Sequence, residues 1–127
     1  MRLLTHNYLI SNVKGTKDGY PLQIEATEVV VEDNPFDEDL VTGILPKLNY
    51  EAVIGALNQL ADKVEPKPPT IPETLPEGEI DTATLEALYH VLFNIHVIEG
   101  HLVCPDTGRK FPIKQGIPNM ILHEDEI

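Results

Sequence analysis

The chain has 127 residues, of which 42% are hydrophobic, and a formal net charge of −12. This length suits one ordinary domain with a single core, and this hydrophobic content argues against full disorder. Nine basic residues against 21 acidic ones argue against direct binding of nucleic acid, because each phosphate contact needs a cation. The acidity favours solubility, and it also allows electrostatic attraction to a basic partner.

The cellular compartment is limited by two features of the sequence. Cys104 is the single cysteine, and a secreted disulfide scaffold needs an even set. The first seven residues lack the long apolar run of a signal peptide, and no stretch reaches the ~18 apolar residues of a membrane helix. We therefore expect a soluble, intracellular protein with no membrane association.

The first third of the chain shows strand and loop signals. Leu3 and Leu4 precede the polar run 5–7, which predicts a strand followed by a turn. Two glycines in the stretch 13–19 indicate a loop. Apolar and polar residues alternate over 21–25, and 29–31 is a β-branched run, so we expect two further strands.

Helix signals fill the middle of the chain. Asn34-Pro35 predicts a helix start, because Asn supplies a capping acceptor and Pro suits the first helical position. Pro46 should end this helix, and Asn49 should cap the next one. The apolar positions of the first helix are Phe36, Leu40, Val41 and Ile44, and those of the second are Val53, Ala56, Leu57, Leu60 and Ala61.

A proline-rich segment separates these helices from the last one. Five prolines lie between residues 64 and 76, and proline has no backbone donor, so we expect an extended linker there. Asp81 should cap a third helix. Its buried stripe would comprise Leu85, Leu88, Leu92 and Ile95 or His96.

Period-two signals return after the third helix. The stretch 97–104 resembles a hairpin that turns at Glu99-Gly100, and 110–113 predicts another strand. A turn at 114–116 leads to the last apolar run, 117–122. Strands at both ends with helices between them predict an α+β fold. We expect a small antiparallel sheet domain from 1–33 plus 97–127, and a central helical insert, 34–96, that includes the linker 64–80.

The sequence carries no convincing catalytic pattern. It contains neither GxGxxG nor GxxxxGK[ST], so no nucleotide cradle is predicted. The five histidines show no HxxxH or HExxH spacing. The stretch 104–109 has the outline of a zinc-ribbon knuckle, but Thr107 stands where Cys-x-x-Cys needs its second cysteine. One thiolate is too few for a tetrahedral zinc site. A small metal-binding or thiol protein that uses Cys104 and histidines remains the alternative, and a generic acidic adaptor is a third possibility.

The run from Ile117 to Leu122 is apolar and close to the C-terminal end. An exposed apolar edge strand is an aggregation hazard unless something covers it. The run is either core within the chain's own sheet or a docking edge where a partner adds a strand. Both interpretations hold together if the strand is paired on one side only.

Four segments resemble a known family. The opening, residues 1–7, and the stretches 98–105 and 108–113 are similar to segments of the multifunctional methyltransferase subunit family, the eukaryotic tRNA methyltransferase activators numbered one hundred and twelve. Gly116 to Leu122 is the most specific match. The order and spacing of these segments extend the resemblance over essentially the whole chain.

The resemblance implies a fold and a function. Family members combine a zinc-ribbon-like sheet domain built from both termini with a central helical domain, and they have no known catalysis of their own. They form 1:1 heterodimers with class I methyltransferases that use S-adenosylmethionine and modify tRNA, small-subunit ribosomal RNA and a translation release factor. The cofactor is therefore expected in the partner and none in this chain, and the location is expected to be cytoplasmic and nuclear.

This chain departs from the zinc-bearing members of that family. Those carry two cysteines near the N-terminus and a Cys-x-x-Cys near the C-terminus. The corresponding positions here are Ser11, Thr16, Cys104 and Thr107. Three of four ligands are replaced, so we expect no metal site and a ribbon held by packing alone.

The resemblance also implies where partners bind. We expect the backbone of 117–122 to pair with an edge strand of the methyltransferase, with flanking polar contacts and weaker apolar ones from the first central helix. The predicted partner-binding residues are Thr5, His6, Asn7, Phe36, Leu40, Gly116, Ile117, Pro118, Asn119, Met120, Ile121 and Leu122.

Overall fold

A computed structural model describes residues 1–64, 68–75, 78–122 and 124–126. The described residues form a four-stranded antiparallel sheet in the order β1-β2-β3-β4, together with several helices. The strands are β1 (Gln23–Val31), β2 (Ile95–Val103), β3 (Lys110–Lys114) and β4 (Ile117–Pro118). The predicted α+β class is confirmed, since β1 comes from the N-terminal part of the chain and the other strands from the C-terminal part.

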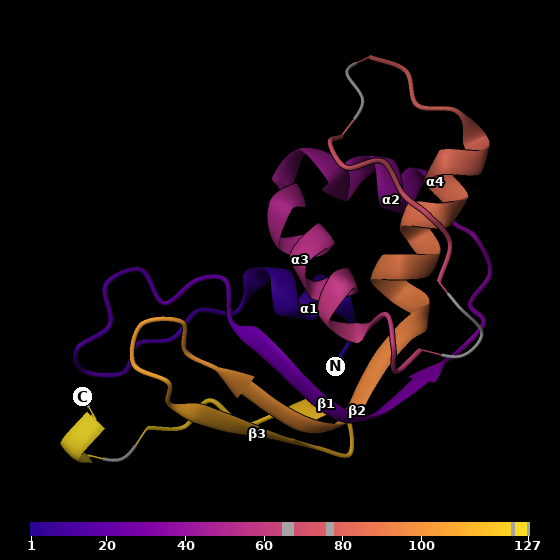
Figure 1. The fold of residues 1–127 in the computed structure, drawn as a ribbon. Coiled ribbons are helices and arrows are strands. Elements are labelled where there is room, and N and C mark those ends of the chain that lie inside the picture. Colours follow the sequence, from indigo (N-terminus) through magenta and orange to yellow (C-terminus); the bar gives the residue numbers. More distant parts are fainter. Residues whose placement is uncertain (65–67, 76–77, 123, 127) are drawn as a thin grey trace.

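The helices gather on one side of this sheet (Figure 1). They are α1 (Leu3–Tyr8), α2 (Glu38–Ile44), α3 (Tyr50–Leu60) and α4 (Thr82–Tyr89). Helix α3 packs on β1 and α1 packs on α3, whereas α2 packs on α4. The shorter helical segments are η1 (Leu45–Lys47), η2 (His90–Asn94, a π-helical segment directly after α4) and η3 (Glu124–Glu126). None of the helices in the described ranges is long and apolar enough to cross a membrane.

The core lies between the sheet and the helices. Each strand sends alternate side chains inward, so Leu102 and Phe111 are fully buried. Full burial of one such side chain contributes about 1.5–3 kcal/mol. The largest buried apolar side chains are Leu3, Leu22, Leu60, Leu88, Leu92, Ile95, Leu102, Phe111 and Ile113.

The two central helix predictions fared differently. Asn49 caps α3 as expected, because its side chain accepts a hydrogen bond from the N–H of Ala52. The helix start at Asn34-Pro35 was wrong, since α2 begins after Asp37, whose carboxylate accepts from the N–H of Leu40. The side chain of Asn34 instead bonds Asn94.

Three local predictions at the sheet were also wrong. Leu3 and Leu4 lie in helix α1, and the two expected strands of 21–31 are one strand, β1, with a bulge between Ala26 and Val29. Strand β2 runs straight through Glu99-Gly100 without a hairpin. Pairing with β1 along its whole length keeps β2 extended there, because Gly100 opposes Ala26 across the ladder.

The predicted division into 1–33 plus 97–127 and 34–96 stays a prediction. The elements follow it closely, since β1 ends at Val31 and β2 begins at Ile95. The described parts of the linker, 68–75 and 78–80, contain neither helix nor strand, while 65–67 and 76–77 lie outside the described residues.

Candidate functional site

The C-terminal candidate segment begins with a tight hairpin. Gln115 and Gly116 have φ values of 53° and 77° and connect β3 to β4, with Lys114 and Ile117 paired on either side. Positive φ at both central positions is the geometry whose twist matches a two-residue hairpin. Gly116 is also held from two sides, because its N–H donates to Ile98 at 2.9 Å and its carbonyl accepts from the Met1 ammonium at 2.7 Å.

Strand β4 lies at the edge of the sheet and is short. Its pairing among the described residues is with β3, so the expected one-sided edge is present. The expected strand 117–122, however, shrinks to Ile117–Pro118. Proline supplies no backbone donor, so Pro112 in β3 cannot donate a hydrogen bond back toward Asn119, and the β3–β4 ladder ends at Pro118. Beyond it, the N–H of Asn119 still donates to the carbonyl of Pro112 at 2.9 Å.

The side chains of this segment divide into two sets. Ile117 is 68% exposed and Ile121 is 76% exposed, and these are the largest exposed fractions among the bulky apolar side chains described. Met120 and Leu122 are half-buried against the core. The segment thus presents two isoleucines outward while the methionine and the leucine attach it to the body of the molecule.

The predicted residues of α1 lie mainly inside the protein. Thr5 is exposed, but the side chains of His6 and Asn7 are buried. Nε2 of His6 lies 2.6 Å from the carbonyl of Leu22, and burial lowers the pKa of His6 while that hydrogen bond raises it. Asn7 bonds the backbone of Asn49 at the start of α3. In this conformation a partner could therefore contact the side chain of Thr5, but not those of His6 and Asn7.

Phe36 and Leu40 lie apart from the sheet edge. Their side chains are 37% and 42% exposed. Phe36 meets Tyr89 edge-to-face at 5.6 Å, and Tyr89 stacks on Phe93 at 4.7 Å. Figure 1 shows α2 among the helices, whereas β3 lies at the opposite, lower side of the molecule. The predicted partner-binding residues thus fall into a sheet-edge group and a helical group.

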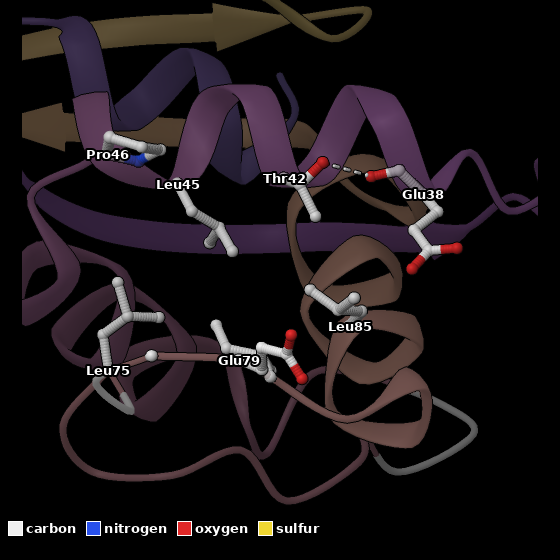
Figure 2. A pocket seen from close by; sticks show the side chains of 9 residues that line it. Glu38, Thr42, Leu45, Pro46, Leu75, Glu79 and Leu85 are labelled. Carbon is white, nitrogen blue, oxygen red and sulfur yellow. Dashed lines mark hydrogen bonds between the residues drawn. The ribbon is translucent and has the colours of Figure 1, made fainter.

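A groove of about 550 Å³ opens beneath α2. Figure 2 shows Glu38, Thr42 and Leu45 facing Leu75 and Glu79 across it, with Leu85 of α4 at one side. The hydroxyl of Thr42 donates to the carbonyl of Glu38 in its own helix. The lining that the described residues provide is therefore mainly apolar with two carboxylates, and none of these residues is a histidine, cysteine or lysine for nucleophilic or acid–base work.

The residues of the metal or thiol alternative are dispersed. Within the described ranges no group of three or more His, Cys, Asp or Glu residues is placed to hold a metal ion. Nδ1 of His90 pairs with Asn94 at 3.1 Å, and Nε2 of His96 lies 3.6 Å from Glu32. His123 lies outside the described residues.

A zinc ion of the kind that the resemblance implies for zinc-bearing members does not fit the donor set of this chain. Cys104 is 1% exposed; the hydroxyl of Thr16 lies 3.6 Å from its sulfur, and the hydroxyls of Ser11 and Thr107 lie near it. Zinc in structural sites is bound by four thiolate or imidazole ligands. One thiolate among three hydroxyls supplies a quarter of that set, so the cluster is not a zinc site by its chemistry.

Comparison with known proteins gives a consistent answer. A family model described as "Trm112p-like protein" matches residues 2–116. The chain is 40% identical over 130 residues to multifunctional methyltransferase subunit TRM112 homolog A of Arabidopsis thaliana, with 100% of both chains covered. It is 42% identical over 128 residues to the TRM112-like protein of Mus musculus, covering 99% of this chain and 98% of the relative.

A solved structure shares the fold. It is the E. cuniculi Mtq2–Trm112 complex, described as responsible for methylation of the eRF1 translation termination factor. One chain of it matches with a TM-score of 0.58 and 21% identity, covering 95% of each chain. The family model covers most of this chain and the relatives match it from end to end, so the chain belongs to the Trm112p-like family of multifunctional methyltransferase subunits.

Proposed function

We propose that this chain is a non-catalytic subunit that activates and stabilises methyltransferases using S-adenosylmethionine. The carrying observation is the end-to-end similarity to proteins named as multifunctional methyltransferase subunits. The fold match to a chain from the Mtq2–Trm112 complex agrees with it. The proposed partners are class I enzymes acting on tRNA, small-subunit ribosomal RNA and a release factor, each in a 1:1 heterodimer in the cytoplasm or nucleus.

The chemistry of the chain supports a role without catalysis. Cys104 is buried, and the described residues that line the groove beneath α2 include no nucleophile–base pair. The cofactor and the reacting groups then belong to the partner enzyme. The net charge of −12 suits a subunit that leaves RNA binding to its partner and is attracted to a basic, RNA-handling enzyme.

The backbone of the sheet domain supports our assignment of a zinc-ribbon-like fold. The turn 104–109 is closed by hydrogen bonds between Cys104 and Arg109 at 2.9 Å and between Gly108 and Cys104 at 2.9 Å. It lies beside the loop 11–19, as the knuckles of a ribbon lie beside each other. We assign these two loops to the knuckles and the strands β1 to β3 to the ribbon.

The docking surface is assigned to the β4 edge and its exposed isoleucines. Covering Ile117 and Ile121 would contribute about 1.5–3 kcal/mol for each fully buried side chain, partly offset by the entropy of association. Main-chain pairing at a sheet edge tolerates varied partner sequences. Pro118 has no N–H, so at that position the edge offers an acceptor alone.

Co-expression with the Mtq2-type release-factor methyltransferase of the same organism tests this assignment. Ile117→Asp combined with Ile121→Asp should abolish co-purification and methyl transfer to the release factor, with thermal unfolding of the isolated subunit unchanged. Met120→Arg is less suitable, because Met120 is half-buried and its loss perturbs the fold. Ile10→Asp is the matched control, since Ile10 is 47% exposed and lies outside the C-terminal segment.

The same experiment separates the two sheet edges. Strand β1 is the other edge, and Thr27 is exposed at its bulge. Loss of the complex with Thr27→Asp, but not with the double isoleucine variant, would move docking to β1. Absence of any methyltransferase among co-purifying proteins identified by mass spectrometry would contradict the activator role, and stoichiometric zinc would favour the metal-binding alternative.

A further inference from the structure

Two loops that are far apart in sequence meet at one end of the sheet. The first, residues 11–19, follows α1, and the second, residues 104–109, joins β2 to β3. The hydroxyl of Thr16 lies 3.6 Å from the sulfur of Cys104, and either atom can donate. The hydroxyls of Ser11 and Thr107 lie near the same sulfur and lower the pKa of Cys104. Three hydroxyls from both loops thus converge on one buried thiol.

The distance between Thr16 and Cys104 is close to that between two neighbouring ligands of a metal site. In a zinc site with sulfur ligands, bonds of about 2.3 Å place neighbouring sulfurs roughly 3.8 Å apart. The 3.6 Å between Thr16 Oγ1 and Cys104 Sγ is similar. The two loops therefore bring Thr16 and Cys104 to a ligand-like spacing, and the other two hydroxyls, those of Ser11 and Thr107, lie near the same thiol.

The hydroxyls change the chemistry of the thiol. Burial raises the pKa of Cys104, but hydrogen bonds from Ser11, Thr107 and Thr16 outweigh it and bring the pKa down from 9.0 to about 6. A thiolate accepting several hydrogen bonds is a stronger acceptor than a neutral thiol. The lowered pKa of Cys104 therefore agrees with a cluster in which hydroxyl groups donate to its sulfur.

A second contact joins the same two loops. Oδ2 of Asp106 accepts hydrogen bonds from three successive N–H groups, those of Lys17 at 3.2 Å, Asp18 at 3.0 Å and Gly19 at 2.8 Å. Successive amides that point at one anion form a concave anion site. The bond from Gly19 is the main reason why the pKa of Asp106 is lowered.

Gly19 is required at the end of this anion site. Its φ is +66°, and a Cβ there would lie 2.2 Å from the carbonyl oxygen of Ser11. The carbonyl of Gly19 also accepts from the N–H of Ser11 at 2.9 Å. The first loop is therefore closed on itself, with its amides turned toward Asp106.

We propose that this chain joins its two loops by a thiol–hydroxyl cluster around Cys104 and by the Asp106 anion site, in place of a zinc ion. From the sequence we expected the ribbon to be held by packing alone, and that expectation included neither the thiol–hydroxyl cluster nor the Asp106 hydrogen bonds. Folding of this subunit is then independent of zinc supply, whereas a zinc-bonded ribbon would couple its folding to the metal. This inference does not depend on the methyltransferase role.

Metal dependence is the first test. Inductively coupled plasma mass spectrometry of the purified full chain should find no stoichiometric zinc. The melting temperature of the chain should be the same with and without EDTA. One bound zinc per chain, or a melting temperature that falls with chelator, would overturn the proposal.

The Asp106 contact is tested by Asp106→Asn. This change removes the charge that strengthens three hydrogen bonds, so the melting temperature should fall by roughly 3–6 °C. Asp62→Asn is the matched control, because Asp62 is exposed in the turn after α3. Equal melting temperatures for the two variants would argue against the contact.

Restoring thiols tests the convergence itself. The variant with Ser11→Cys, Thr16→Cys and Thr107→Cys should bind one Co²⁺ per chain with the absorption of a tetrahedral thiolate site, and EDTA should now lower its melting temperature. The wild type should show no such absorption. If the folded triple variant fails to bind Co²⁺, the four positions do not share a centre and the proposal is overturned.

Discussion

Asn7 and Asn49 are joined by two hydrogen bonds across 42 positions of sequence. The side-chain amide of Asn7 donates to the carbonyl of Asn49 at 2.8 Å, and the N–H of Asn49 donates to Oδ1 of Asn7 at 3.0 Å. Asn49 uses its own side chain to cap α3. One buried amide thereby attaches α1 to the first turn of α3.

Replacing this amide should destabilise the fold measurably. Asn7→Ala leaves the N–H of Asn49 without its partner, while the carbonyl of Asn49 keeps the hydrogen bond from the N–H of Val53. The free energy of unfolding in urea should therefore fall by about 1–3 kcal/mol. Asn12→Ala is the control, because Asn12 is exposed in the loop after α1. Similar losses in both variants would show that the attachment of α1 to α3 contributes nothing specific.

The stability of the subunit should fall in mildly acidic solution. Burial lowers the pKa of His6 and that of His96 below 6.5, so the unfolded chain takes up protons first as the pH falls. Stability from the neutral imidazoles is present above pH 6.5 and is lost below it, as the pH approaches the folded pKa values.

Urea unfolding of His6→Gln between pH 7 and pH 5 tests this dependence. Glutamine keeps a donor toward Leu22 but cannot take up a proton, so the variant should lose less stability over this interval than the wild type. His101→Gln, at an exposed position of β2, should behave as the wild type. An unchanged slope for His6→Gln would assign the dependence to other groups.

Two glycine substitutions should act in opposite directions. A Cβ at Gly100 would lie 2.2 Å from the carbonyl oxygen of Glu25 in β1, whereas one at Gly55 in α3 meets nothing within 4 Å. Gly100→Ala should therefore destabilise by about 1–3 kcal/mol. Gly55→Ala should stabilise by about 0.5–1 kcal/mol, since alanine favours a helix interior. Calorimetric melting that moves both variants the same way would contradict this assignment.

The sequence by itself determined the elements whose signals are local. The cap at Asn49, the buried face of α3 and the turn at Gln115-Gly116 were all predicted, because caps, helical periodicity and turn residues act over a few positions. The same signals failed at Leu3 and Leu4, where two apolar residues are too few to distinguish a strand from the buried face of a short helix.

Only the tertiary structure decided which distant segments meet. Pairing with β1 keeps β2 extended through Gly100, which a local turn signal had suggested as a hairpin. Burial of Asn7 was equally invisible, because its partner Asn49 lies in another element. The loops around Thr16 and Cys104 touch because the register of the sheet places the start of β1 beside the end of β2. Long-range pairing is a property of the assembled sheet and not of any short stretch, so the contacts that join the two ends of this chain appear only once it is folded.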